Sequence, residues 1–161
     1  MNEELVNLAK KAAIYSDLKQ QHASILIADD MIITGYNHFC GSNGNTNSKA
    51  CITVHAEEDA INNFITLCRK KYFDDAYIRR RLRRALLITV RVKNGIIKCS
   101  APCENCIEII KSYGIRQIIY SDSDENANTY YIQRKSRDLS NRPSSGFRWR
   151  AKQNKSILLS R

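Results

Sequence analysis

The chain of 161 residues has the length of one domain, with 43% apolar residues and a formal net charge of +10. Its apolar runs are far shorter than the ~20 residues of a membrane span, and its N-terminus is a charged amphipathic pattern rather than a signal peptide. We therefore expect a cytoplasmic protein without a membrane partner, whose six cysteines are reduced thiols or metal ligands.

The positive charge is concentrated in two segments. Residues 69–84 hold eight Lys or Arg and two Asp, and residues 131–161 hold nine Lys or Arg and one Asp. The rest of the chain is mildly acidic. Each basic segment is either solvated surface or a binding site for an anionic partner such as nucleic acid.

Apolar spacing and turn residues predict an alternation of helices and strands. In chain order we expect a helix within residues 3–20, strands over 24–28 and 31–37, a helix from His55, a short helix over 74–84, a strand over 85–92, a helix over 103–114, and strands over 115–122 and 129–135. This order predicts one α/β domain over residues 1–132 with a mixed sheet, and the two helices from His55 and Cys103 on one face. Residues 133–161 are expected to form a basic, mostly extended or disordered tail.

Two cysteines lie three residues apart behind a proline, in Pro102-Cys103-Glu104-Asn105-Cys106. On its own this pair is compatible with a redox couple, a metal site or core packing. The spacing places both sulfurs on one face of a helix, where Pro102 suits the first helical position. A second short motif, His55-Ala56-Glu57, opens another predicted helix and makes the metal site the favoured reading.

One imidazole and two thiolates suit zinc better than harder metals, so His55, Cys103 and Cys106 are the candidate ligands. Positively polarised helix N-termini favour the thiolate forms that zinc binds. Three protein ligands leave a fourth position for water, and zinc lowers the pKa of such a water to roughly 7. Glu57 is not needed as a ligand and is free to carry protons. We expect one catalytic Zn²⁺ per chain.

The H-x-E motif at 55–57 followed by P-C-x-x-C at 102–106 resembles the signature of zinc-dependent nucleobase deaminases. Over residues 5–122 the chain resembles the cytidine and deoxycytidylate deaminase superfamily, with a pattern nearest to deoxycytidylate deaminases. The stretches MIITGYN (31–37) and KSYGIRQIIYSD (111–122) extend this resemblance beyond the two motifs. It implies a three-layer α/β fold with a central mixed sheet of about five strands flanked by helices.

The resemblance also implies roles for individual residues. These are zinc binding by His55, Cys103 and Cys106, proton transfer by Glu57, and substrate contacts by Asn37, Tyr36 and Ala56. For Tyr36, packing is an alternative to stacking on a base. The implied reaction is hydrolytic deamination of a cytosine nucleoside or nucleotide, by a protein that forms homo-oligomers.

The chain departs from the family pattern at Asp59, where the pattern H-A-E-x-N-A has asparagine, and the segment beyond residue 130 matches nothing in that pattern. One alternative is therefore a deaminase that acts on cytosine or adenine within RNA or DNA, held through residues 69–84 and the tail. Another is a non-catalytic, zinc-stabilised module that binds nucleic acid.

Three further cysteines bear on the number of metal sites. His38, Cys40 and Cys51 flank the Gly/Asn-rich loop and form a candidate second, structural zinc site. Cys99 lies four residues before Cys103 and is expected to pack rather than to bind metal, because a fourth thiolate would close the site to water.

Overall fold

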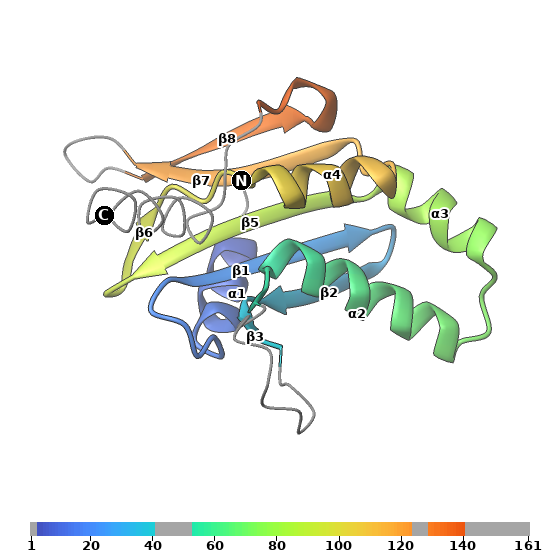
Figure 1. Cartoon of the computed structure of the whole chain (residues 1–161), viewed down its shortest axis with the longest axis horizontal. Helices are drawn as coiled ribbons and strands as arrows, with labels where there is room; N and C mark the ends of the chain where they lie inside the picture. The colour runs from blue at the N-terminus through green and yellow to red at the C-terminus, as the bar shows by residue number, and fades with distance from the viewer. Residues whose placement is uncertain (1–2, 41–52, 124–128, 141–161) are drawn as a thin grey trace, which may run out of the picture.

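The computed structural model describes residues 3–40, 53–123 and 129–140 (Figure 1). Its elements are α1 (Glu3–Ala13), β1 (Gln21–Ala28), β2 (Met31–Tyr36), β3 (His38–Phe39), β4 (Thr53–Val54), α2 (Ala56–Lys70), α3 (Asp75–Arg84), β5 (Leu86–Lys93), β6 (Ile96–Lys98), α4 (Glu104–Ser112), β7 (Gln117–Ser123), β8 (Thr129–Lys135) and the 3₁₀ turn η1 (Ser136–Asp138). None of the described helices is long and apolar enough to cross a membrane.

The main sheet has six strands in the order β2-β1-β5-β7-β8, with β6 paired to the end of β5. The pair β5–β7 is parallel, whereas β1–β2, β1–β5, β5–β6 and β7–β8 are antiparallel. The predicted mixed sheet is therefore confirmed. A separate pair of very short strands, β3 and β4, was not predicted.

Helices cover both faces of this sheet, which gives three layers (Figure 1). Successive strand residues point to opposite faces, so neighbours such as Ile25 and Leu26 enter different cores. Leu26 and Leu87 belong to the core beneath α2, α3 and α4, while Ile25 and Ile88 pack with Val6 of α1. The predicted three-layer arrangement, with α2 and α4 on one face, is confirmed.

The first helix ends earlier than its apolar spacing predicts. The amides of Ile14, Tyr15 and Ser16 each donate to the carbonyl three residues back, which tightens and ends the helix after Ala13. In a longer helix Tyr15 would share the apolar face of Leu5, Leu8 and Ala12, but it lies beyond the helix and is 74% exposed. The chain after the helix instead leads into β1, which begins at Gln21, before the predicted start at residue 24.

The strand predicted over 129–135 is confirmed as β8, which pairs with β7 along its whole length. The domain boundary predicted after residue 132 falls inside this strand. Most of the predicted tail, residues 141–161, lies outside the described residues.

Candidate active site

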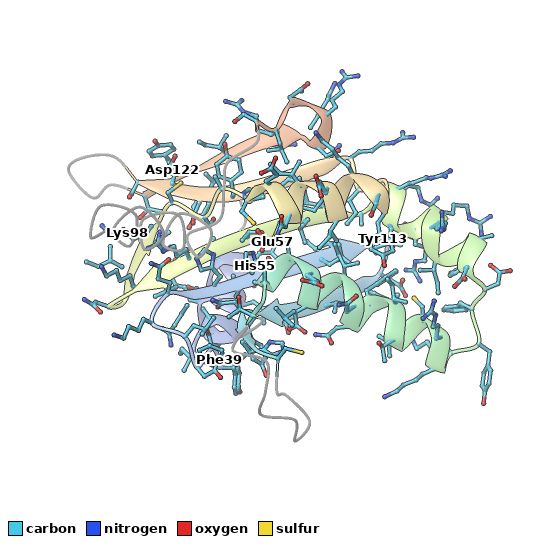
Figure 2. The ribbon with its side chains drawn as sticks, in the orientation of Figure 1. Phe39, His55, Glu57, Lys98, Tyr113 and Asp122 are labelled. Atoms are coloured by element: carbon cyan, nitrogen blue, oxygen red, sulfur yellow. The ribbon has the colours of Figure 1, made fainter. Side chains whose placement is uncertain are left out.

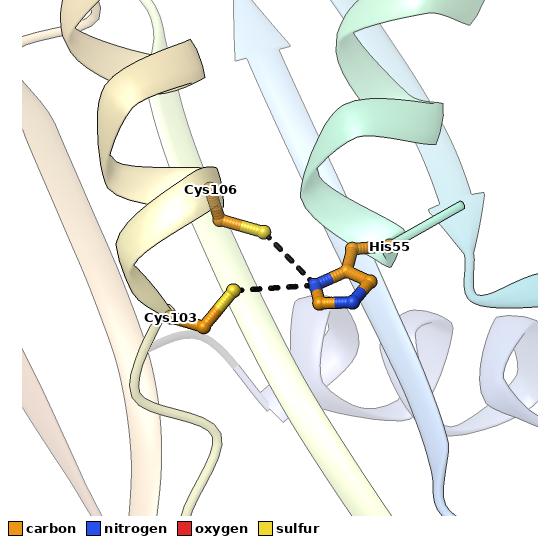
Figure 3. A group of neighbouring side chains, drawn as sticks. All are labelled: His55, Cys103 and Cys106. Atoms are coloured by element: carbon orange, nitrogen blue, oxygen red, sulfur yellow. Dashed lines mark hydrogen bonds between the residues drawn. The ribbon is translucent and has the colours of Figure 1, made fainter. Parts of the chain in front are cut away.

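The predicted metal ligands come together at the N-termini of two neighbouring helices (Figure 3). His55 is the N-cap of α2, Cys103 is the N-cap of α4, and Cys106 lies in the first turn of α4. His55 Nδ1 lies 3.2 Å from Cys106 Sγ and 3.4 Å from Cys103 Sγ. Pro102 precedes the N-cap, so its predicted place at the first helical position is wrong. Cys103 has an extended backbone and caps the helix, which begins at Glu104, two residues after Pro102.

These three side chains fit a zinc ion in both chemistry and spacing. Their ligand atoms all lie within 4.8 Å of one another, and no other such group occurs among the residues that the structure describes. Zinc bonds of about 2.3 Å to sulfur and about 2.0 Å to nitrogen imply roughly 3.6 Å between N and S in a tetrahedron. The observed N–S separations are within a few tenths of an ångström of that value.

The two thiols are electrostatically coupled. The pKa of Cys103 is lowered to about 4, chiefly by a hydrogen bond from Cys106. The hydrogen bond with His55 lowers this pKa further, while burial of the thiol opposes the change. The same interaction with Cys103, followed by burial, raises the pKa of Cys106. One sulfur of the pair thus carries the negative charge by itself. A bound divalent cation would allow both sulfurs to ionise, which is the form that zinc requires.

Glu57 lies beside this group and is 4% exposed (Figure 2). Burial is the largest effect on its carboxyl group and raises the pKa of Glu57, while the charge of His55 opposes that rise. A buried carboxyl group with a raised pKa suits a residue that must both accept and return a proton.

A close approach of α2 to β2 fixes the position of the His55–Glu57 motif. A Cβ atom at Gly35 would lie 2.2 Å from Ala60 N and 2.8 Å from Ala56 O, so only glycine allows this packing. Asp59 ties the same two elements together, because its Oδ2 accepts a hydrogen bond of 3.0 Å from the amide of Tyr36. Asp59, the residue that departs from the family pattern, thus helps to orient the His55–Glu57 motif.

The candidate substrate contacts lie at the end of β2 and the start of α2. Asn37 is buried, and its side chain accepts from His22 N and donates to Gln20 O, both at 2.7 Å. The Tyr36 ring contacts the rings of Tyr15 and His38, with centroids 5.9 and 5.4 Å apart, as the packing alternative expects. Ala56 is fully buried. The roles of Asn37, Tyr36 and Ala56 toward a substrate stay predictions.

A network of buried hydroxyl groups anchors the loop that carries Cys103. Ser100 Oγ donates to Thr89 O at 2.7 Å and lies 2.9 Å from Ser121 Oγ, so the loop is tied to both β5 and β7. Thr89 Oγ1 in turn lies 2.9 Å from Ser24 Oγ on β1. Four polar side chains inside the core thereby satisfy one another and hold the start of α4.

Two polar residues near the site were not singled out from the sequence. His22, on β1, is paired in register with Arg91 on β5. Burial, followed by the charges of Arg91 and His55, lowers the pKa of His22 to about 4. The available signal was the pattern of ALLITVRV, in which Arg91 is the one charged residue of an otherwise apolar or hydroxylated central strand.

Part of the basic segment 69–84 has a structural role. Arg81 of α3 is buried, donates to Ala28 O at 2.7 Å, and forms ion pairs with Asp29 and Asp30 at 3.0 and 2.6 Å. Arg79, Arg80 and Arg83 instead line an open hollow of about 530 Å³ on α3. That hollow is formed by α3 and its N-cap Asp74, and none of the metal-ligating residues lines it.

The candidate second zinc site is only partly within the described residues. His38 Nδ1 lies 3.0 Å from Tyr36 O and Cys40 is exposed, whereas Cys51 lies outside the described residues. That site therefore stays untested. Cys99 is half-buried and does not belong to the group of metal-ligating side chains.

Comparison with protein families gives one match that spans most of the chain. The family model described as the cytidine and deoxycytidylate deaminase zinc-binding region matches residues 1–122. Comparison with curated proteins gives no match.

Two cytidine deaminases are among the solved structures that share this fold, and a dCMP deaminase is similar at a lower score. The enzyme from Burkholderia pseudomallei is 15% identical and has a TM-score of 0.55, over 89% of this chain and 100% of that one. The enzyme from Mycobacterium tuberculosis is 18% identical and has a TM-score of 0.51, over 86% and 94%. The dCMP deaminase from the cyanophage S-TIM5 is 18% identical, with a TM-score of 0.44 over 78% and 88%.

Proposed function

Because this chain belongs to the cytidine and deoxycytidylate deaminase family, we propose that it is a zinc-dependent hydrolase that deaminates a cytosine nucleoside or nucleotide. The product is the uracil form, and ammonia is released. The observation that carries the proposal is the meeting of His55, Cys103 and Cys106 beside the buried carboxyl group of Glu57.

The residues divide the work between metal binding and proton transfer. His55, Cys103 and Cys106 would hold the zinc ion, which supplies Lewis acidity that lowers the pKa of water. The water oxygen bonds to ring carbon C4, and the bond from C4 to the exocyclic amine breaks. Glu57 takes the protons of the water in turn and delivers one to the ring nitrogen and one to the departing amine. Asn37, Tyr36 and Ala56 are the proposed contacts to the base or sugar.

Glu57 also separates this proposal from a non-catalytic zinc module. A purely structural zinc site has no use for a buried carboxyl group beside its ligands, whereas a hydrolase requires a proton carrier. We expect Glu57→Gln to lower turnover by about 10²- to 10⁴-fold while zinc content and thermal stability stay close to wild type.

The matched control for this variant is Glu58→Gln, which makes the same change one residue further along α2 and should leave turnover nearly unaffected. Ammonia release is measured with cytosine and adenine nucleosides, nucleotides and short oligonucleotides, alongside zinc content by atomic absorption. Full activity of Glu57→Gln would refute the role given to Glu57, and loss of zinc with activity would make it a ligand.

A second candidate function is deamination within RNA or DNA. The arginines Arg79, Arg80 and Arg83 on α3 favour it, because they form a basic surface. Arg81 is buried and does not belong to this surface. Turnover of oligonucleotides but not of free nucleotides, with a steep loss of affinity as salt rises, would select this candidate.

We also propose that the chain forms a homo-oligomer. Several large apolar side chains are exposed in the single chain and offer contact surface, namely Ile14, Tyr15, Ile32 and Phe39.

A further inference from the structure

A row of three basic side chains crosses the sheet at the end where α2 and α4 begin. His22 on β1 is paired in register with Arg91 on β5, and Arg91 is paired with Lys98 on β6. Directly paired residues of neighbouring antiparallel strands project from the same face of a sheet. The adjacent residues Val92 and Ile97 pack on the α1 side. The row therefore faces the opposite side, which carries α2, α4 and the metal-ligating group.

The row lies close to the metal-ligating group along β5. The preceding pair on the same face is Ser24 and Thr89, and Thr89 O accepts the hydrogen bond from Ser100 that anchors the Cys103 loop. Arg91 follows Thr89 by two residues, or about 7 Å along the strand.

One further observation places the row at the end of the sheet where α2 and α4 begin. Figure 2 shows Lys98 on the side of His55 and Glu57 away from Tyr113, the residue at the far end of α4.

The charge of the row is not neutralised within the described part of the protein. None of the ion pairs there includes Arg91 or Lys98. Arg91 Nε is buried and has no hydrogen-bond partner. Arg81 Nε is the other buried nitrogen of this kind, but it lies 3.0 Å from Asp29 Oδ2 in an ion pair, whereas no ion pair among the described residues includes Arg91. A buried guanidinium nitrogen without an acceptor is costly, so Arg91 is suited to an acceptor brought by a ligand.

We propose that Arg91 and Lys98 bind the phosphate group of the substrate, which makes the substrate a cytosine nucleoside monophosphate rather than a free nucleoside. This rests on the proposed deamination. Arginine offers a planar fork of donors that matches phosphate oxygens, and lysine adds a second positive charge. With the base at the metal-ligating group, the row offers two cationic side chains on the same face of the sheet that take part in no ion pair within the described residues. Arg91 is then a specificity-determining residue.

The test compares nucleotide and nucleoside with the same variants. Wild type should deaminate deoxycytidine monophosphate with a kcat/KM at least about 10-fold above that for deoxycytidine. Arg91→Gln should lower kcat/KM for the nucleotide by about 10- to 100-fold, mainly through KM, and leave the nucleoside value within about threefold. Lys98→Gln should give a smaller loss of the same kind. Arg134→Gln, which removes the same charge from an exposed position on β8, should change neither value.

Binding is measured separately from turnover. Calorimetry is carried out on Glu57→Gln and on the double variant Glu57→Gln with Arg91→Gln. The double variant should bind deoxyuridine monophosphate and inorganic phosphate more weakly than the single variant does. The affinity for deoxyuridine should be the same in both. Arg91→Lys should recover part of it, because the charge returns without the fork. Thermal unfolding and zinc content show whether each variant is intact.

Equal kcat/KM values for nucleotide and nucleoside in wild type would overturn the phosphate site, as would unchanged affinity for both phosphate ligands in the Arg91 variant. The phosphate site would also be overturned if Arg91→Gln lost zinc and had a lower kcat/KM for both substrates alike. Arg91 would then act by balancing the negative charge of the cysteine sulfurs. Absence of any deamination by wild type would instead refute the proposed function, while the calorimetric comparison would still decide the phosphate site.

Discussion

His22 illustrates how one half-buried side chain links the site to the stability of the fold. Its backbone amide donates to Asn37 Oδ1, and its position on β1 is paired with Arg91 on β5. Burial is the main reason that the pKa of His22 falls to about 4 from 6.5. The folded protein therefore keeps this ring neutral at pH values where the unfolded chain would protonate it.

This difference in protonation predicts a loss of stability in mild acid. Between pH 6.5 and about 4 the unfolded chain binds a proton at His22 that the folded chain does not, so the free energy of unfolding falls as pH decreases. The loss should reach up to about 3 kcal/mol. Urea unfolding at several pH values checks it, with His22→Gln as the comparison, since acid effects at the zinc ligands are common to both proteins. Parallel curves for the two proteins would contradict the prediction.

At the scale of elements, the packing of α2 on β2 decides where the His55–Glu57 motif lies. Gly35 is the position at which the helix backbone comes closest to the strand. The contact involves backbone atoms of Ala56 and Ala60, which cannot move aside as a flexible side chain would. An added methyl group must therefore displace the whole helix.

We accordingly expect Gly35→Ala to lower the free energy of unfolding by about 3 kcal/mol or more and to reduce zinc content, because α2 carries His55. The control is Gly95→Ala in the β5–β6 turn, where φ is +76° and no atom lies within 4 Å of an added Cβ. Backbone strain alone should cost about 1 kcal/mol there. Denaturant unfolding of both variants measures the difference. Equal losses would show that the close approach at Gly35 is not limiting.

At the scale of the whole molecule, β8 closes the far edge of the sheet. Its seven residues pair with β7, and Ser136 N donates to Arg116 O just beyond it. A chain ending at residue 132 loses the pairs that Ile118 and Ile119 make with Arg134 and Gln133, whereas a chain ending at residue 140 keeps them. We expect the shorter chain to melt roughly 5–10 °C below the longer one. Identical melting temperatures would place the end of the domain at residue 132.

Features of the fold that depend on residues close together in the sequence could be predicted. The end of the helix predicted over 103–114 was readable because Gly114, with φ of +75°, favours the conformation that closes a helix. That His55, Cys103 and Cys106 lie together was readable because their residue types and spacing are specific. The comparisons then confirmed the family.

Features that depend on pairing between distant strands could not be read in this way. The early start of β1 is one, since its first residues, Gln21 and His22, pair with Val92 and Arg91 of β5. The row of His22, Arg91 and Lys98 is another, because it exists only once three strands are in register. The structural use of Arg81 likewise depends on the β1–β2 turn, which lies more than 50 residues away.

The split of the metal ligands between two helices has a consequence for how the protein matures. His55 and Cys103 are 48 residues apart, so in an unfolded chain the imidazole is not held beside the neighbouring thiols Cys103 and Cys106. The third candidate ligand arrives when the sheet has brought α2 and α4 together. Zinc would then bind the folded chain more tightly than the unfolded one, and mass action would convert that difference into stability, about 2.7 kcal/mol when free zinc is 100 times its dissociation constant. A cell short of zinc would hold less of this protein as well as a less active form of it.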